Sequence, residues 1–219
     1  MKDNRKILRM SQLYIRVFGS PEIIHGEQVL SFSSRKEKAL LLYLAVEGGR
    51  HLRKELLRIF WPDLDSKRGH TVLRGAIMRL RKGLDRTHMP EEQAHLIVER
   101  SSLELALTSN VVFDLHPLAA AWQLIQDRPS MLALWTREAH QEVSKLFDQA
   151  LRSYQGIFLA DFSLRDAPLF DEWTRMQSQQ WHVRMMHICE RAVRWQEMAG
   201  DTEHAIRIAG QWLALDHLQ

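Results

Sequence analysis

The sequence contains a single cysteine, Cys189, among 219 residues. One thiol excludes an intrachain disulfide framework and also a zinc site built from several thiolates. No run of 18 apolar residues occurs, which excludes a membrane-spanning helix, and the basic N-terminus lacks the apolar stretch of a secretory signal. A hydrophobic content of 45% supports a packed core. These features predict a folded, cytoplasmic protein with no membrane partner.

The sequence also lacks the motifs of common enzymes. It has no Gly-x-x-x-x-Gly-Lys-Ser/Thr phosphate loop and no His-Glu-x-x-His metal pair. Carboxylates gather at Asp161, Asp166, Asp171 and Glu172. Helix capping and loop solvation explain this cluster better than the paired-carboxylate chemistry of glycosidases. The sequence therefore predicts no enzyme activity, no catalytic residue, no metal site and no cofactor.

Charge is distributed unevenly along the chain. Residues 1–110 contain 20 Lys/Arg and 13 Asp/Glu, a net charge of +7, whereas residues 111–219 contain 10 and 14, a net of −4. A basic half joined to an acidic half indicates one domain for a polyanion and another for a different partner. A charge excess of this size also fits many ordinary surfaces, so other features must decide its meaning.

The basic half has strand patterns first, then helix patterns, then a hairpin. Ser34 and Glu37 have the spacing of a capping box, and Gly48 follows the helix that they begin. Trp61 ends the second helix, because the residue before a proline avoids the helical region. The expected elements are strands at 13–18, 22–24 and 29–32, helices at about 35–47, 53–60 and 65–85, and strands at 96–98 and 103–107.

The helix at 65–85 has two different faces. Leu73, Ile77 and Leu80 recur at helical spacing and predict a buried stripe. The segment 65–86 carries seven Lys/Arg and two Asp, a net charge of +5. A helix of this kind fits the major groove of DNA, where Arg pairs with guanine and Lys holds phosphate. Gly75 on the outward face would allow a close approach of the backbone. The same pattern also fits the solvated basic face of a core helix.

The order of the elements favours DNA binding. A short helix, a tight loop, a basic helix and a β-hairpin together form a winged helix-turn-helix, whose second helix enters the groove. The residues predicted to contact DNA are Lys67, Arg68, His70, Thr71, Arg74, Met78, Arg79, Arg81 and Lys82 on this helix and Arg100 in the wing.

The acidic half shows only helical patterns, at about 114–127, 130–155, 168–199 and 202–215. Six of the seven tryptophans lie in this half, where core positions explain them better than a ligand-binding surface. The last two helices have small and large residues spaced like a tetratricopeptide repeat (TPR) pair. Because such pairs need further repeats to stack on, we expect the chain to be the front part of a longer protein.

Three blocks of sequence resemble a known family. LLLYLAVEGGRHLRKELLRIFWPD and HTVLRGAIMRLRKGLD resemble the OmpR-type winged-helix domain of bacterial activators of the antibiotic-regulatory (SARP) and AfsR type. SYQGIFLADFSLRDAPLFDEW resembles the bacterial transcriptional activator domain that follows it there. The resemblance implies an α+β N-terminal winged helix-turn-helix at 11–110 and an all-α TPR-like helical domain at 114–219, with the boundary at 108–113.

The resemblance also implies a function. It implies a sequence-specific transcriptional activator that binds direct repeats in double-stranded DNA through the 65–85 helix, often as two protomers. It places a contact with RNA polymerase in the loop at 62–69, which contains Asp63, Asp65 and Lys67. It further implies a four-stranded N-terminal sheet.

One departure from the family leaves an alternative open. The wing of the family usually turns through glycines, whereas here the turn reads Arg100-Ser101-Ser102. Serine adopts positive φ less readily than glycine or asparagine, so the wing is expected to differ in shape or to lose its groove contact. Together with the acidic, tryptophan-rich second half, this supports an alternative function. The alternative is a helical-repeat scaffold whose winged helix binds protein rather than DNA.

Overall fold

The structure, a computed structural model, describes residues 12–84, 96–107, 110–127 and 136–216. Two compact units are formed, and their sequences interleave. Unit 1 comprises the chain up to Ile15, Glu22–Phe113 and Phe162–Thr174; unit 2 comprises Arg16–Pro21, Asp114–Asp161 and the chain from Arg175 on. The predicted helical residues 130–135 lie outside the described ranges. The predicted boundary at 108–113 and the domain ranges 11–110 and 114–219 remain predictions about the chain.

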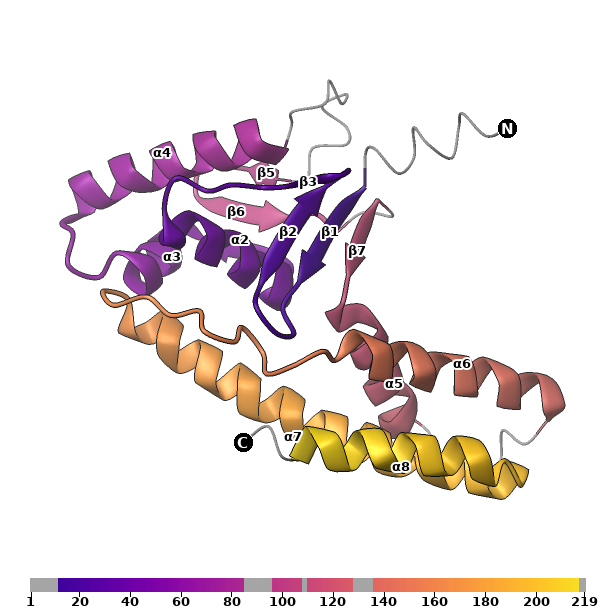
Figure 1. The fold of residues 1–219 in the computed structure, drawn as a ribbon. Coiled ribbons are helices and arrows are strands. Elements are labelled where there is room, and N and C mark those ends of the chain that lie inside the picture. Colours follow the sequence, from indigo (N-terminus) through magenta and orange to yellow (C-terminus); the bar gives the residue numbers. More distant parts are fainter. Residues whose placement is uncertain (1–11, 85–95, 108–109, 128–135, 217–219) are drawn as a thin grey trace, which may run out of the picture. The chain divides into compact units, whose positions relative to one another are not determined.

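A small four-stranded sheet belongs to unit 1 (Figure 1). Its strands lie in the order β3-β2-β1-β7, and β1 runs parallel to β7 with Leu13 opposite Val111. The sheet is thus four-stranded, as the resemblance implies, but its fourth strand comes from the predicted boundary segment. The strands are β1 (Leu13–Arg16), β2 (Glu22–His25), β3 (Gln28–Val29) and β7 (Val111–Phe113).

Three helices of unit 1 follow the predicted pattern closely: α2 (Arg35–Glu47), α3 (Arg53–Phe60) and α4 (Ser66–Leu84). Helix α2 begins where predicted, because the Ser34 hydroxyl accepts the backbone N–H of Glu37. It ends at Gly48, whose φ of 62° lies in the region that favours glycine.

The wing is a three-stranded sheet in the order β4-β6-β5. Two of its strands, β5 (Leu96–Val98) and β6 (Ser102–Leu105), form the predicted hairpin. The third, β4 (Arg50–Leu52), pairs antiparallel with β6. The sequence analysis did not predict β4, because three residues directly after the glycines at 48 and 49 carry no readable alternation.

The segment Phe162–Thr174 belongs to unit 1 although it follows the predicted helical domain in sequence. The Phe170 ring lies 5.5 Å from that of Phe60 in α3, and Phe170 has no exposed surface. The Trp173 ring lies 4.9 Å from that of Tyr43 in α2, and its indole N–H donates to Glu47 at 2.6 Å. Part of the block that resembles the activator domain therefore completes the core of unit 1.

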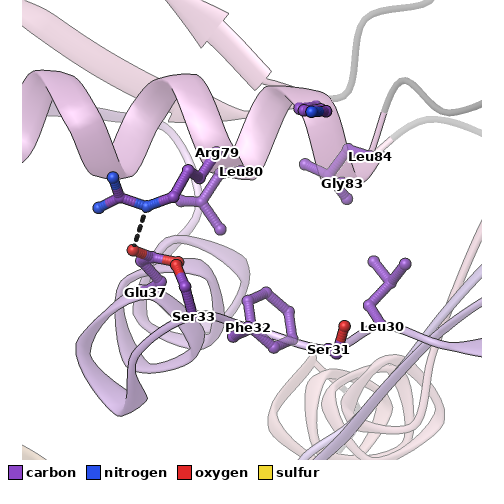
Figure 2. Close-up of a pocket in the computed structure, with 10 residues that line it drawn as sticks. Leu30, Ser31, Phe32, Ser33, Glu37, Arg79, Leu80, Gly83 and Leu84 are labelled. Carbon is purple, nitrogen blue, oxygen red and sulfur yellow. Dashed lines mark hydrogen bonds and ion pairs between the residues drawn. The ribbon is translucent and has the colours of Figure 1, made fainter.

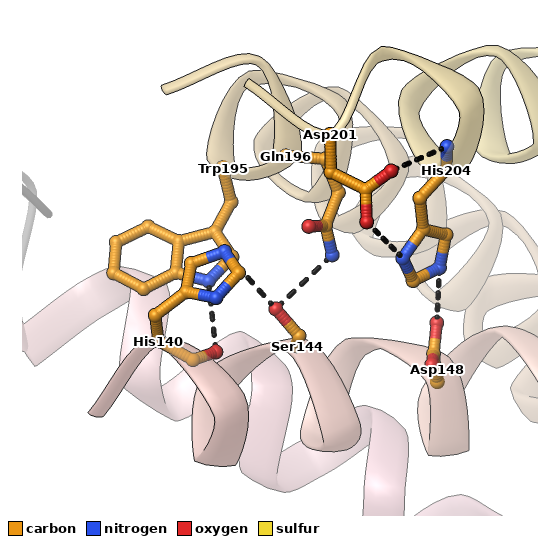
Figure 3. A network of polar contacts seen from close by, with 7 residues as sticks. All are labelled: His140, Ser144, Asp148, Trp195, Gln196, Asp201 and His204. Carbon is orange, nitrogen blue, oxygen red and sulfur yellow. Dashed lines mark hydrogen bonds and ion pairs between the residues drawn. The ribbon is translucent and has the colours of Figure 1, made fainter. Parts of the chain in front are cut away.

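The helices of unit 2 are α5 (Leu115–Asp127), α6 (Arg137–Ser153), α7 (Pro168–Ala199) from Arg175 on, and α8 (Thr202–Asp216). Polar contacts join α6 to α7 and α8 (Figure 3). The Trp195 indole donates to the His140 carbonyl at 3.3 Å, and the His204 ring lies 2.9 Å from an Asp148 oxygen. The chain is thus an α+β winged helix-turn-helix followed by a TPR-like helical domain.

None of the described helices is both long and apolar enough to cross a membrane.

A short stretch near the N-terminus is built into unit 2. The backbone N–H groups of Val17 and Phe18 donate to the Asp114 carboxylate at 2.9 and 3.0 Å. The backbone of Gly19 is so close to Gly156 that a Cβ on Gly156 would lie 3.1 Å from the Gly19 Cα. Gly156 is therefore required by close packing of two backbones, whereas Gly19 is favoured by its positive φ of 89°.

Candidate nucleic-acid interface

The helix-turn-helix consists of α3 and α4 in unit 1. Helix α4 is capped by Asp65, whose side chain accepts the backbone N–H of Arg68 at 2.9 Å. The two helices approach closely at Gly69, where an added Cβ would lie 3.2 Å from the Leu57 Cδ2 atom. The absence of a side chain at residue 69 therefore lets α4 pack directly on α3.

The predicted core stripe of α4 is confirmed. Leu73, Ile77 and Leu80 are 1%, 5% and 2% exposed, so this face is almost entirely removed from water. Burial of three such side chains contributes about 1.5–3 kcal/mol each, as an upper range. The orientation of α4 about its own axis is thereby set, and the basic residues are left on the open side.

All the residues of α4 predicted to contact DNA are exposed in the structure. Met78 is the most notable of them, since 66% of a large apolar side chain faces solvent between cationic neighbours. The exposed set is Lys67, Arg68, His70, Thr71, Arg74, Met78, Arg79, Arg81 and Lys82.

These exposed residues differ in their contacts within the chain. The Thr71 hydroxyl donates to the Lys67 carbonyl at 3.0 Å, and the Arg68 side chain lies 3.5 Å from Asp65. In the described part of the chain, no ion pair or hydrogen bond engages the side chains of Lys67, Arg74, Arg81 and Lys82. These four cations are therefore available to an external anion.

Arg79 is held by a buried carboxylate (Figure 2). Its Nε donates to Glu37 Oε1 at 2.6 Å, and the Ser33 hydroxyl donates to the other Glu37 oxygen at 2.7 Å. Only 3% of the Glu37 side chain is exposed, against 45% for Arg79. The pair lies beside a pocket of about 340 Å³ that reaches from residues 30–33 to the end of α4.

The wing turn contains no glycine and is stabilised by the side chain of Glu99. Neither Arg100 nor Ser101 has a positive φ, so the turn carries no backbone strain at these residues. The Glu99 carboxylate accepts the Ser102 hydroxyl at 2.9 Å and pairs with Arg50 at 2.9 Å. The wing therefore forms a regular hairpin, and Arg100 lies exposed at its tip.

The wing and the helix-turn-helix are joined through the first residue of α3. The Arg53 backbone N–H donates to the Ser101 carbonyl at 2.9 Å, and its guanidinium donates to the Glu99 carbonyl at 2.7 Å. Because the α3 N-terminus has no side-chain cap, the wing turn supplies one of its missing acceptors. The wing turn is thus hydrogen-bonded to the first helix of the helix-turn-helix within unit 1.

The loop predicted to contact RNA polymerase lies between α3 and α4. Asp63 is exposed, whereas the Asp65 carboxylate is occupied by the cap and by Arg68. Beside the loop is an open groove of about 620 Å³, bounded by Trp61 and Leu64 together with Val72 of α4. The loop therefore offers an apolar groove and one carboxylate, that of Asp63, for which the described residues provide no hydrogen bond or ion pair.

Two site features were missed by the sequence analysis. The capping box pointed to the Glu37 side chain bonding back to the start of α2, but it reaches across to Arg79 in α4. Gly75 was interpreted as space for DNA, but an added Cβ there would lie 3.2 Å from Arg79 Nη1. The first is a contact between residues 42 positions apart in sequence, which no local spacing indicates, whereas Gly75 and Arg79 are only four residues apart on the same helix. Among the described residues, no group of three or more His, Cys, Asp or Glu side chains could hold a metal ion.

Comparisons with known proteins bear on the fold. No family model and no curated protein matches the sequence. Among solved structures, the chain is similar to Mycobacterium tuberculosis EmbR in complex with a low-affinity phosphopeptide, with a TM-score of 0.63 and 15% sequence identity. The match covers 90% of this chain and 48% of that one, so this chain spans about half the length of the EmbR chain. At this identity the likeness shows the fold alone, a winged helix followed by a helical domain.

Proposed function

We propose that the chain is a sequence-specific DNA-binding transcriptional regulator, an activator, that recognises direct repeats in double-stranded DNA. The observation that carries the proposal is the open face of α4, where four cations have no partner in the described chain. Such a face on the second helix of a winged helix-turn-helix has the shape and charge to enter a major groove. The regulator would act in the cytoplasm, without a cofactor and without enzyme activity.

The residues have different expected roles. Arg74 and Met78 lie on the outward part of α4, where Arg can pair with guanine and an apolar side chain can contact a thymine methyl group. Lys67 at the start of the helix is suited to a phosphate, because Lys acts as a point charge. The remaining proposed contacts are Arg68, His70, Thr71, Arg79, Arg81 and Lys82, with Arg100 in the wing.

A contact with RNA polymerase is part of the proposal. Asp63 is the best candidate in the loop, because it is exposed and plays no part in capping α4. Asp65 and Lys67 follow it in the sequence, but the Asp65 side chain already caps α4. Two protomers bound head to tail on a direct repeat would each present such a loop.

The test is selection of bound sites from random duplex DNA, followed by affinity measurements against salt. Enrichment of direct repeats, with a steep fall in affinity as salt rises, would support the proposal, since six or more phosphate contacts give a steep slope. The exposed Met78 and the apolar groove beside α4 favour a second candidate, a helical-repeat scaffold whose winged helix binds protein. Weak, flat binding without enrichment would favour that scaffold.

A further inference from the structure

We propose that Glu37 is a positioning residue that fixes the Arg79 guanidinium, so that Arg79 holds one DNA backbone phosphate at the flank of α4. The inference rests on the proposed DNA-binding function and adds a residue of α2 to the interface. It also assigns Arg79 a phosphate rather than a base.

The Glu37 carboxylate is held in place by contacts other than the one with Arg79. The Glu37 backbone N–H donates to the Ser34 hydroxyl at 3.2 Å, which holds the residue in the first turn of α2. One carboxylate oxygen accepts the Ser33 hydroxyl at 2.7 Å, and the side chain is 3% exposed. Glu37 is therefore a fixed, buried acceptor with one oxygen directed at α4 (Figure 2).

Arg79 uses only one of its five N–H groups on this carboxylate. The contact is through Nε, at 2.6 Å, and the four N–H groups on Nη1 and Nη2 have no partner in the described part of the chain. Guanidinium N–H pairs match two adjacent oxygens bidentately. A carboxylate on Nε thus leaves the opposite edge of the guanidinium open for a phosphate.

Gly75 gives the guanidinium its place on the helix surface. The outer nitrogens lie 3.2 and 3.6 Å from the point where a Cβ of Gly75 would be. The arginine side chain therefore folds back by one turn along α4 rather than extending into solvent. Because Glu37 holds its Nε and Gly75 lies against its guanidinium, Arg79 loses less rotamer freedom on binding than an arginine with no such contacts.

The position of Arg79 favours phosphate over base. The bond from Arg79 Nε to Glu37 holds the guanidinium toward the start of α2, at one side of the open face of α4. A helix in the major groove directs the middle of its open face to the bases and its flanks to the two backbones. Arg79 is on a flank, so a phosphate is the acceptor that it would meet.

Positioning and simple charge predict opposite results, which makes the inference testable. If Glu37 only neutralises Arg79, its removal should strengthen DNA binding, because a negative charge leaves the interface. If Glu37 orients Arg79, its removal should weaken binding even though the protein becomes more positive. Glu37→Met removes both charge and acceptor at similar size, whereas Glu37→Gln removes the charge but keeps an acceptor.

The experiment measures affinity of the whole chain for its selected duplex and for a random duplex, with the folded fraction of every variant checked by thermal melting. Arg79→Ala should weaken both duplexes alike, by about five- to twentyfold, and reduce the salt slope by about one. Glu37→Met should weaken binding about three- to tenfold, and Glu37→Gln should stay within about twofold of the parent. In an Arg79→Ala background, Glu37→Met should have no further effect.

Arg74 supplies the matched control, because it lies on the same helix and has no side-chain partner among the described residues. Glu37→Met should cause the same loss in an Arg74→Ala background as in the parent. Tighter binding of both Glu37 variants would overturn the positioning role, and loss confined to the selected duplex in Arg79→Ala would overturn the phosphate assignment. If Arg74→Ala weakens binding but Arg79→Ala does not, the inference fails while the proposed function stands. If neither matters and the salt slope is flat, the proposed function itself fails.

Discussion

Gly69 in α4 lies against Leu57 in α3, with only 3.2 Å between an added Cβ and the Leu57 Cδ2 atom. This contact sets how closely the two helices of the helix-turn-helix approach. The neighbour is a leucine side chain, which can shift slightly, so a methyl group is close to the limit that the site accepts.

A larger side chain at residue 69 should therefore destabilise the protein by overpacking against α3. A control substitution elsewhere in α4 separates this effect from the change in helix propensity. Gly69→Val should lower the free energy of unfolding by about 1–3 kcal/mol, because overpacking forces α4 away from α3. Gly83→Ala is the control in the same helix: nothing lies within 4 Å of its added Cβ, and it should stabilise by up to about 1 kcal/mol. Urea unfolding of both variants measures this, and equal effects would contradict the packing role of Gly69.

A second prediction concerns Phe170, which lies in the segment 162–174 that completes unit 1. Phe170→Ala should lower the free energy of unfolding by about 3–5 kcal/mol and reduce DNA binding, because it opens a cavity beside Phe60. Phe147 is equally buried but belongs to unit 2, so Phe147→Ala should destabilise that unit instead. Binding of duplex DNA and near-ultraviolet circular dichroism would be compared. Loss of DNA binding in Phe147→Ala alone would contradict the assignment.

The third prediction is a pH dependence that arises from Asp114. Burial raises the pKa of this carboxyl group from 3.8 to about 6, against the opposing effect of the hydrogen bonds from Phe18 and Val17. The folded state therefore holds the proton more tightly than the unfolded chain. The stabilising contribution of this group is complete below about pH 4 and is lost as the pH rises through about 6.

Asp114→Asn should remove this dependence, since an amide oxygen still accepts the backbone N–H groups but does not titrate. Between pH 4 and 7 the parent should lose about 2–3 kcal/mol more stability than Asp114→Asn. Asp114→Ala should instead be less stable at every pH, by about 1–3 kcal/mol for each N–H left without an acceptor. Urea unfolding across this range would show it, and parallel curves for parent and Asp114→Asn would refute the assignment.

The fourth prediction distinguishes base from phosphate contacts on α4. Arg74→Ala should weaken binding to the selected duplex by about 1–3 kcal/mol and relax its sequence preference, if Arg74 pairs with a base. Lys67→Ala should weaken all duplexes alike and reduce the salt slope by about one. Fluorescence anisotropy at several salt concentrations separates the two patterns. Unchanged affinity and an unchanged salt slope for both variants would contradict these assignments.

The fifth prediction uses the single cysteine. Cys189 has no exposed surface, and burial raises the pKa of its thiol to about 12. Since only the thiolate reacts, the folded protein should resist a thiol-specific disulfide reagent at pH 8, with a rate at least about a hundredfold below that of a free thiol. One thiol should become reactive in denaturant. Rapid labelling of the native protein would contradict the burial.

Regularities within one element could be predicted from the sequence, whereas contacts between distant elements could not. The stripe of Leu73, Ile77 and Leu80 and the cap at Ser34 indicate their helices directly, because both depend on residues a few positions apart. The strands at 50–52 and 111–113 are too short to show alternation, and only their partner strands define them. The Glu37–Arg79 pair has no local signal of any kind.

The packing of residues 162–174 has the same explanation. The sequence pattern indicates that Phe170 and Trp173 are ordinary buried positions of a helix. It does not indicate whether they pack in the core of unit 1 or of unit 2. Their partners, Phe60 and Tyr43, lie more than a hundred residues earlier. The exposed cations of α4 could be listed from the sequence, but the one engaged by a buried carboxylate could not be singled out.

The interleaving of the two units has a consequence for how such a chain can be inherited or re-engineered. Since the chain passes between the units at residues 15–16, 21–22, 113–114, 161–162 and 174–175, no single cut separates them. A chimera that exchanged only the first 113 residues with another regulator would leave Phe170 and Trp173 facing surfaces that they did not evolve with. A successful exchange of DNA specificity would have to carry the segment 162–174 with it, or be confined to the outward side chains of α4.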